Sequence, residues 1–261
     1  MELEAVYVEP AGADAPGVVA ARAAGVPVRD VLAGVLAKVL DLVTPQDVVA
    51  VARQRGAGLD ELVAGAVASS RPVLVLVELQ DPGNAGTLVR VAEAAGCAGV
   101  VLTERSVDVH NPKTVRASAG AVFRVPVAEG MSPAAVLEAC AIAGLPTWAT
   151  TGRGGTPVDG APLAGACAVF LGSEAHGLPA SVSDACTGRL TIPMEGRAES
   201  LNAGVAGALV AFEAARQRRV GELSGQPSGS TGVSLGHNDG SLDPRADRTG
   251  PDRPPATDAE P

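Results

Sequence analysis

The sequence predicts an α/β fold whose parallel sheet is covered by helices on both faces. Between residues 71 and 220, short segments that are apolar throughout alternate with segments whose apolar residues recur at helical spacing. Strands that are apolar along their whole length are typical of a parallel sheet buried on both faces. With 46% hydrophobic and 19% charged residues, the composition is ordinary for a chain that buries a core.

The elements of this main domain follow from the same patterns. The first strand is followed by Asp81, Pro82 and Gly83, which predict a turn, and Asn84 is placed to cap the next helix. Six segments have the composition of buried strands: 73–79, 99–103, 122–127, 147–150, 168–172 and 190–192. Five segments have helical spacing: 84–95, 113–119, 133–143, 179–185 and 201–218.

The rest of the chain divides into three further regions. Residues 55–70 predict a linker that contains one short helix. Residues 221–261 are rich in Gly, Ser, Pro and Asp and almost lack apolar residues, which predicts a disordered tail. Residues 1–54 predict a small α/β unit, with strands at 5–8 and 48–51 and helices at 17–25 and 29–42.

Composition and charge narrow the function classes. The net charge of −9 argues against a general attraction to nucleic acid, but residues 221–261 hold seven acidic residues and three arginines, or −4 of that total. Arginines that cluster locally on the remaining body can still bind RNA phosphates. Aromatic residues make up only 2% of the chain, so any RNA is expected to be recognised by shape and backbone rather than by base stacking.

The sequence predicts neither a metal site nor a membrane segment. The four cysteines, Cys97, Cys140, Cys167 and Cys186, form no C-x-x-C pair, and three of them are expected to be buried free thiols. The three histidines lack metal-ligand spacing. No apolar stretch approaches the roughly 18 residues of a membrane span, and the N-terminus lacks a secretion signal. A cytoplasmic location is therefore expected.

The first segment that suggests a site runs from Glu78 to Arg90, across the end of a strand and the start of a helix. Arg90 lies roughly 160° away from the apolar face with which this helix packs on the sheet. Sites in open α/β folds lie beyond the carboxyl ends of the strands, so Arg90 points toward the expected site, and Gly86 is expected to leave open space beside it. Taken alone, a solvated surface arginine is the commoner explanation.

The second segment is the loop that follows the strand at 168–172. Gly172 and Gly177 flank Glu174, so the backbone of this loop is expected to approach another group closely. An ordinary strand-to-helix turn is the alternative. Neither G-x-G-x-x-G nor G-x-x-x-x-G-K-[ST] occurs in the chain, which leaves dinucleotide and nucleoside triphosphate folds without support.

The third segment is Ile192-Pro193-Met194, which is followed by Ser200-Leu201-Asn202 and the last helix. Ser200 occupies a position typical of a helix N-cap. Gly204 and Gly207 each destabilise the helix by roughly 1 kcal/mol relative to alanine, so they predict that another helix packs closely there and indicate an interface.

Together, the three segments resemble the signature motifs of the SpoU (TrmH-like) family of RNA 2′-O-ribose methyltransferases, in the SPOUT superfamily. Gly172 and Ile192 are 20 residues apart, and Ile192 and Leu201 are 9 apart. The resemblance covers residues 73–218 and includes a similar segment at 111–123. Residues 31–51 resemble the end of the family's N-terminal substrate-binding domain, so 1–54 are expected to be a partial RNA-binding domain.

The resemblance implies a C-terminal trefoil knot, S-adenosylmethionine as the cofactor, and a homodimer with the site at its interface. Carried over by position, four residues would bind the cofactor: Gly172, Ile192, Met194 and Leu201. Methyl transfer from a sulfonium needs no metal. The family helix after Leu201 often continues with valine and serine, where this chain has Ala203 and Gly204, a change that affects packing more than chemistry.

Arg90 is the expected catalytic residue. A guanidinium is a poor proton acceptor, so Arg90 is expected to hold a phosphate and to stabilise the developing alkoxide. The resemblance implies that the loops and the ribose hydroxyl are oriented by Asn84, Glu174, Ser200 and Asn202. Contacts with RNA are expected from Arg53, Arg55, Lys113 and Arg116.

Several functions remain open from the sequence. Ribosomal RNA is the favoured substrate and transfer RNA the alternative. A non-catalytic RNA-binding protein on the same fold is disfavoured because Arg90 and Asn202 are present, and a base-nitrogen methyltransferase is disfavoured by the combination of Asn84, Arg90 and the Ser200–Asn202 triplet. A dinucleotide-dependent enzyme would have to use the glycines at 152–155, which are expected to form a surface loop.

Overall fold

The computed structural model describes residues 2–40, 46–54, 56–173 and 175–224, and the side chains only to residue 221. The predicted tail at 221–261 therefore lies almost entirely outside the described residues. Its first four residues belong to the last helix, which continues to Ser224.

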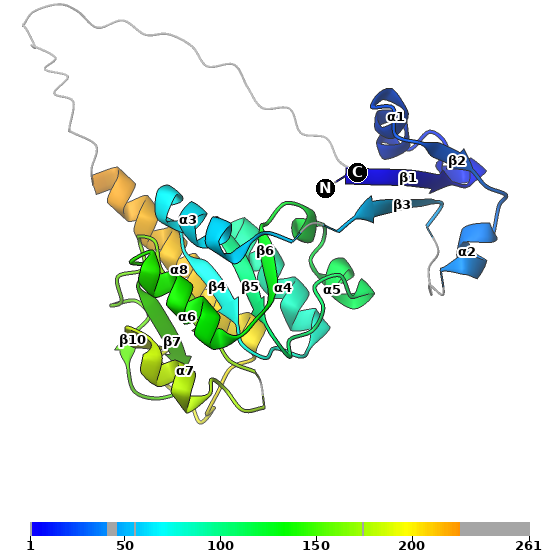
Figure 1. Ribbon diagram of the computed structural model, residues 1–261. Coiled ribbons are helices and arrows are strands. Elements are labelled where there is room, and N and C mark those ends of the chain that lie inside the picture. Colours follow the sequence, from blue (N-terminus) through cyan, green and yellow to red (C-terminus); the bar gives the residue numbers. More distant parts are fainter. Residues whose placement is uncertain (1, 41–45, 55, 174, 225–261) are drawn as a thin grey trace, which may run out of the picture. The chain divides into compact units, whose positions relative to one another are not determined.

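A small three-stranded sheet forms the N-terminal part of the chain (Figure 1). Its strands are β1 (Glu2–Val8), β2 (Val28–Asp30) and β3 (Val48–Arg53), in the order β2-β1-β3. β2 is parallel to β1, and β3 is antiparallel to it. The helix α1 (Pro16–Ala23) packs on one face, where Val6, Val8, Val18 and Ala21 form a small core.

The helix predicted at 29–42 is wrong in its first half. Val28–Asp30 pairs with β1 as an edge strand, and the helix α2 is confined to Val35–Val39. Gly34 precedes α2 with a left-handed φ of 78°. The buried carboxylate of Glu9 accepts hydrogen bonds from the backbone N–H groups of Gly34 and Leu36, both at 2.8 Å, and so caps the helix from outside it.

The predicted linker at 55–70 contains a helix that belongs to the main domain. This helix, α3 (Leu59–Ser69), buries Leu62, Val63 and Ala66 in the core beneath the large sheet. Residues that are one and three positions apart lie on the same face of a helix. α3 therefore packs on the sheet through this face and is not part of a linker.

The main domain contains a seven-stranded sheet in which every pairing is parallel, as the sequence predicts. The strand order is β6-β5-β4-β9-β7-β10-β8. The strands are β4 (Val73–Leu76), β5 (Gly99–Thr103), β6 (Val127–Met131), β7 (Thr147–Thr151), β8 (Thr156–Pro157), β9 (Ala168–Leu171) and β10 (Gly188–Thr191).

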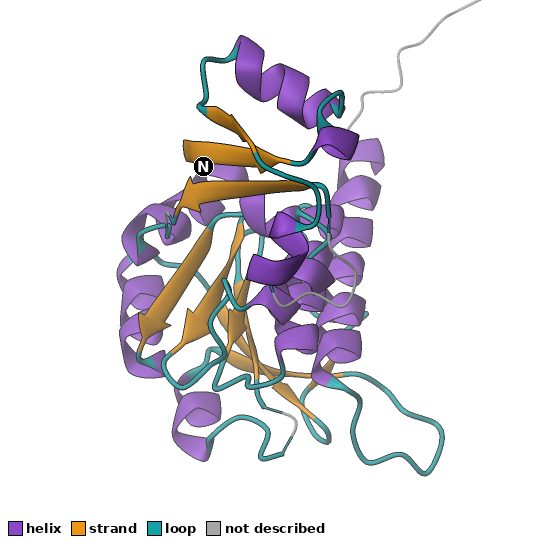
Figure 2. Ribbon diagram, turned by 90° about the vertical axis from the view of Figure 1, so that its right-hand side faces the viewer, coloured by secondary structure: helices purple, strands orange, loops and turns teal. Residues whose placement is uncertain are grey.

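Helices cover both faces of this sheet (Figure 2). One face buries the apolar residues of α4 (Pro82–Ala95) and α8 (Ala203–Ser224), and α5 (Pro112–Ala117) packs beside α4. The other face is covered by α3, α6 (Pro133–Ile142) and α7 (Ala180–Ala185). None of the described helices is long and apolar enough to cross a lipid bilayer.

The strand predicted at 122–127 is wrong. Ala121–Phe123 forms a 3-10 turn, and β6 begins only at Val127. Residues three apart lie on the same side of a 3-10 turn, so Val122 and Val125 are both buried in the core that α4 shares. Their apolar character reflects burial against that helix rather than membership of the sheet.

The strand order places a topological switch between β4 and β9. From β4 the chain continues through β5 to β6 at one end of the sheet, and it then returns to build β7, β9 and β10 on the other side of β4. Ligands of open parallel sheets bind beyond the carboxyl ends of the strands at such a switch. All three predicted site segments begin at this edge, after β4, β9 and β10.

Candidate active site

A cavity of about 170 Å³ opens at the carboxyl ends of β9, β7 and β10. It is lined by five residues that the sequence singles out: Gly172, Ile192, Met194, Ser200 and Leu201. The second and third site segments thus form one pocket although they are separate in the sequence. The first segment does not line the pocket, but its Asn84 is hydrogen bonded to Asn202, which adjoins the lining residue Leu201.

The loop after β9 folds back onto Gly172. A Cβ atom at Gly172 would lie 2.1 Å from the carbonyl carbon of Gly177 and 2.3 Å from the amide nitrogen of Leu178. The amide of Gly177, which has a left-handed φ of 66°, donates to the carbonyl of Ser173 at 2.8 Å. Only glycine fits at 172, and the loop therefore presents backbone atoms to the cavity. Glu174 lies outside the described residues.

The sequence did not predict the contribution of β7. Thr150, Thr151 and Gly152 line the cavity, and the hydroxyl of Thr150 donates to the carbonyl of Phe170 in β9 at 2.9 Å. These residues join the site because β7 lies between β9 and β10 in the sheet. Strand order is not encoded in any local pattern, so no sequence signal pointed to Thr150 and Thr151, and Gly152 was expected only in a surface loop.

Both predicted helix caps lie elsewhere. The N-cap of α4 is Asp81, whose carboxylate accepts the N–H of Asn84 at 2.7 Å. α8 begins at Ala203, and the side-chain oxygen of Asn202, not that of Ser200, accepts the N–H of Val205 at 3.2 Å. Asn84 is thereby positioned in the first turn of α4, where its side chain can reach across to α8.

Asn84 and Asn202 join the first and third site segments. The side-chain amide of Asn202 donates to Oδ1 of Asn84 at 3.1 Å. Gly204 lies at the same point: a Cβ there would be 3.1 Å from the Oδ1 atom of each asparagine. This glycine lets the two asparagines and the start of α8 meet beside Leu201, at the rim of the cavity.

Gly207 also has an intramolecular role, contrary to the expectation of an interface. A Cβ at Gly207 would lie 2.3 Å from Leu88 in α4 and 2.9 Å from Leu171 in β9. Gly204 and Gly207 therefore allow close packing of α8 on α4 and the sheet within one chain. They give no evidence for contact between subunits.

Arg90 lies on the exposed side of α4 and does not line the cavity. It is six residues beyond Asn84, or about 9 Å along the helix axis. The open space expected beside Gly86 is absent, because a Cβ there would be 2.4 Å from the carbonyl oxygen of Thr114 and 2.6 Å from Cβ of Ala117. Gly86 instead brings α5 against α4.

The residues expected to bind RNA fall in two places. Lys113 and Arg116 are exposed on α5, which packs against the helix that carries Arg90. Arg53 ends β3 in the small sheet, and its Nη2 atom lies 3.2 Å from the carboxylate of Glu4. Arg55 lies outside the described residues.

The cysteines are free, and the three at 97, 140 and 167 are buried, as expected. Burial raises the pKa of Cys97 and of Cys140 to about 11, and that of Cys167 to about 12. Burial also raises the pKa of the half-buried Cys186. These thiols stay protonated at neutral pH, which excludes them as nucleophiles there.

Sequence spacing also missed one cluster of potential metal ligands. Within the described residues, Asp108, His110 and Glu129 place one ligand atom each within 4.8 Å of one another. The two carboxylates accept the backbone N–H groups of His110 and Val109, at 2.7 and 2.9 Å. These hydrogen bonds explain why the three side chains lie together: they link β6 to the loop before α5.

Comparison with known proteins agrees with the fold. A model described as the SpoU rRNA Methylase family matches residues 71–212. The 23S rRNA (guanosine(2553)-2′-O)-methyltransferase RlmP of Bacillus subtilis is 36% identical over 146 residues. That segment is 56% of this chain and 58% of the relative, so the chain spans little more than half of the relative's length.

Two crystal structures share the architecture over most of the chain. An AdoMet-bound rRNA methyltransferase from Sinorhizobium meliloti has a TM-score of 0.73 at 28% identity, covering 83% of this chain and 80% of that one. The SpoU methyltransferase AviRb from Streptomyces viridochromogenes has a TM-score of 0.74 at 25% identity, covering 84% and 83%. The resemblance expected from the three segments is confirmed, and the chain belongs to the SpoU rRNA methylase family.

Proposed function

We propose that this protein transfers a methyl group from S-adenosylmethionine to a ribose 2′-hydroxyl of ribosomal RNA. The observation that carries the proposal is the joining of the three site segments: the loops after β9 and β10 form one cavity, and the Asn84–Asn202 hydrogen bond ties α4 to its rim. Membership of the SpoU family and the methyltransferases among its relatives support this reaction.

The cavity fits the proposed cofactor in shape and chemistry. Ile192, Met194 and Leu201 offer an apolar wall suited to a flat heterocycle, while Gly172 brings backbone atoms within reach of polar groups. Thr151 at the end of β7 and Ser173 in the loop after β9 add hydroxyls. When bound, the cofactor supplies an electrophilic methyl group on a sulfonium. The protein's part is to hold it and the ribose in line, and orientation alone contributes much of the acceleration.

Arg90 has the charge needed at the reacting hydroxyl. A guanidinium is a poor proton acceptor, so Arg90 does not take the hydroxyl proton. It binds a neighbouring phosphate, through which that proton leaves, and stabilises the developing alkoxide. In one subunit Arg90 is about 9 Å along α4 from Asn84 and outside the cavity lining. We infer that it acts on the cavity of a second subunit.

A stripe on α8 supports the proposed homodimer. Val205, Leu209 and Phe212 follow helical spacing, and each remains 46–49% exposed although the opposite face of α8 is buried. An apolar stripe of this kind, on a helix that packs against α4, is suited to a self-complementary contact. The trefoil knot expected from the family stays a prediction.

The remaining assignments follow from the substrate. Lys113 and Arg116 would bind RNA phosphates on the surface beside Arg90, and Arg53 and Arg55 would do so from the N-terminal unit. An RNA substrate implies a cytoplasmic location. Asn84, Glu174, Ser200 and Asn202 would orient the loops and the hydroxyl, and no metal takes part.

Mapping 2′-O-methylated riboses in cells with and without the gene tests this function. Loss of a modified site in ribosomal RNA is expected, and loss of a site only in transfer RNA would identify the alternative substrate. Calorimetry that detects no binding of S-adenosylmethionine or its demethylated product, with or without RNA, would contradict the enzymatic assignment.

The action of Arg90 across subunits has a separate test. In heterodimers of an Arg90→Ala subunit and a Gly172→Val subunit, the first subunit keeps an intact cavity and the second keeps an intact arginine. Mixing the two inactive variants is expected to restore activity. Mixtures that form heterodimers but stay inactive would show that Arg90 acts within its own subunit.

A further inference from the structure

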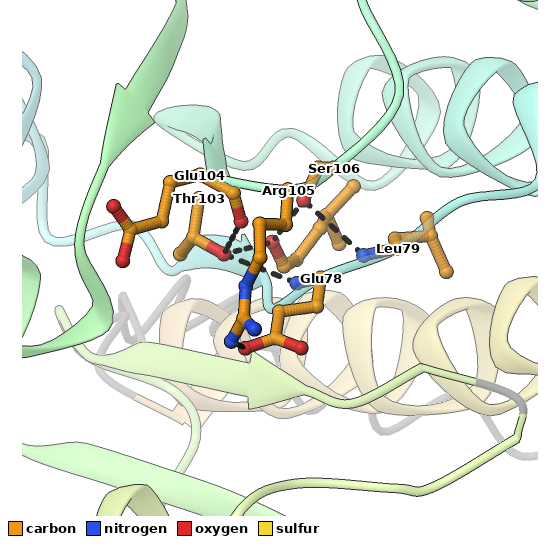
Figure 3. Close-up of polar contacts among 7 residues, drawn as sticks. Glu78, Leu79, Thr103, Glu104, Arg105 and Ser106 are labelled. Atoms are coloured by element: carbon orange, nitrogen blue, oxygen red, sulfur yellow. Dashed lines mark hydrogen bonds and ion pairs between the residues drawn. The ribbon is translucent and has the colours of Figure 1, made fainter.

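The turn that leaves β4 is held in an unusual backbone conformation by side chains from β5 and from the turn that follows it (Figure 3). Glu78 has a left-handed φ of 52°, and Arg105, on the turn after β5, has a left-handed φ of 64°. Both are bulky residues at positions that favour glycine. Their side chains form an ion pair with each other.

Two hydroxyl groups fix this turn, one from Thr103 at the end of β5 and one from Ser106 in the turn that follows it. Thr103 Oγ1 accepts the N–H of Glu78 at 3.1 Å and donates to the carbonyl of Leu76 at 3.3 Å. Ser106 Oγ accepts the N–H of Leu79 at 3.2 Å and lies 3.3 Å from the same carbonyl. These hydrogen bonds join hydroxyls to backbone groups, and none of them uses the charges of Glu78 and Arg105.

The ion pair itself stabilises the fold little. The side chain of Arg105 is 69% exposed, and exposed pairs contribute less than a left-handed conformation costs at one bulky residue. Strained residues that are held by their surroundings occur preferentially at functional sites. The charges therefore call for an explanation other than stability.

Their position beside the cavity supplies one. Leu76 pairs with Leu102 on one side and with Leu171 on the other, and the N–H of Val77 donates to Leu171 at 2.8 Å. Continued by two residues, this register places Val77 level with Gly172 and Glu78 level with Ser173, and both Gly172 and Ser173 line the cavity. Arg105 follows β5, which lies two strands away from β9. At the usual spacing between strands, it is therefore roughly 10 Å from the loop after β9.

We propose that Arg105 binds a backbone phosphate of the RNA that enters the cavity, and that Glu78 orients the guanidinium and opposes phosphates that approach from other directions. The ion pair leaves guanidinium N–H groups available, because Arg has five donors and a carboxylate accepts only some of them. This inference rests on the proposed RNA substrate and adds a contact that lies outside the family-derived site residues.

The salt dependence of RNA binding gives the decisive measurement. Dissociation constants of the full chain for transcribed 23S ribosomal RNA and for bulk transfer RNA are measured over a range of salt concentrations. Arg105→Gly suits the left-handed backbone and removes the charge. It is expected to weaken binding about tenfold at low salt and to make the slope of log K against log salt less negative by roughly 0.7–0.9, the value of one phosphate contact.

Matched variants separate this role from a structural one. Arg189→Ala removes an exposed, carboxylate-paired arginine on β10, near the opposite end of the sheet, and should leave the slope unchanged. Arg105→Gln keeps the length of the side chain and should reproduce the slope change of Arg105→Gly. Affinity for S-adenosylmethionine should stay at the wild-type value in both Arg105 variants.

Glu78→Gln tests the partner. Removing the carboxylate charge is expected to tighten binding of both RNAs about threefold. This gain should vanish in the double variant Glu78→Gln/Arg105→Gly, since it acts through the guanidinium. A wild-type slope in Arg105→Gly, or an unchanged gain in the double variant, would overturn the inference while leaving the proposed reaction intact. A wild-type chain that binds neither RNA would overturn both.

Discussion

Gly172 marks the place where the backbone comes closest to itself at the cavity. Gly172→Val puts atoms within 2.1–2.4 Å of the backbone at Gly177 and Leu178, so the loop must open. Overpacking of this kind costs about 1–3 kcal/mol. We expect affinity for S-adenosylmethionine to fall at least about tenfold, measured by calorimetry, with activity falling in parallel.

The control for this substitution is Gly165→Ala. Gly165 is exposed, and no atom lies within 4 Å of the Cβ that alanine would add. Cofactor affinity and activity should match those of the wild type. If Gly172→Val bound the cofactor normally, the loop after β9 would not be the binding loop.

Arg90→Ala separates binding from chemistry. Removing one preorganised electrostatic contact typically lowers the rate on the order of a hundredfold. Affinity for S-adenosylmethionine should hardly change, because Arg90 does not line the cavity. Arg90→Lys should rescue poorly, since an ammonium lacks the planar fork of donors. Wild-type single-turnover rates in Arg90→Ala would contradict the assignment.

The sequence predicted which residues line the cavity better than it predicted which side chains cap the helices. Gly172, Ile192, Met194, Ser200 and Leu201 all line one pocket because loops at the carboxyl edge of a parallel sheet converge. The cap positions differ because capping depends on where a helix starts, which sequence fixes only to within one or two residues. Asn84 and Asn202 contact each other instead, through a pairing that no local rule describes.

At the scale of elements, the contact of α8 with α4 depends on the absence of a side chain at Gly207. Gly207→Ala would place a methyl group 2.3 Å from Leu88, and the two helices would have to separate. We expect a loss of about 1–3 kcal/mol in the free energy of unfolding, measured by urea denaturation.

Gly221→Ala, on the same helix, is the matched comparison. Nothing lies within 4 Å of the added methyl group, so helix propensity should stabilise the protein by up to about 1 kcal/mol. Equal effects of the two substitutions would argue that α8 does not pack closely on α4.

Helices and strands with a clear hydrophobic period were predicted well, and those that depend on tertiary contacts were not. Helices α4 and α6 and strand β5 lie within two residues of their predicted bounds. The errors at 29–42 and 122–127 share a cause: short apolar stretches were assigned by composition, whereas β2 forms by pairing with β1 and the turn at Ala121–Phe123 by packing on α4.

For the whole molecule, the proposed dimer depends on the exposed stripe of α8. Leu209→Glu introduces a charge into the centre of that stripe, and burying an unpaired charge is costly. Light scattering should report a monomer, and methylation should fall because Arg90 no longer reaches a partner's cavity.

Ile142→Glu provides the control for that substitution. Ile142 is 82% exposed on α6, which covers the other face of the sheet. The mass of this variant in solution should therefore equal that of the wild type. A wild-type chain that scatters as a monomer at micromolar concentration would contradict the dimer directly.

The hydrogen bond between Asn84 and Asn202 spans 118 positions of the chain. Closing so long a loop is entropically costly, and contacts of this separation form late in folding. The rim of the cavity can therefore exist only after β5, β6, β7, β9 and β10 have been placed and α8 has docked. A nascent chain would acquire its binding pocket in the final step of folding, and amide protons near Asn202 should be among the last to become protected from exchange during refolding.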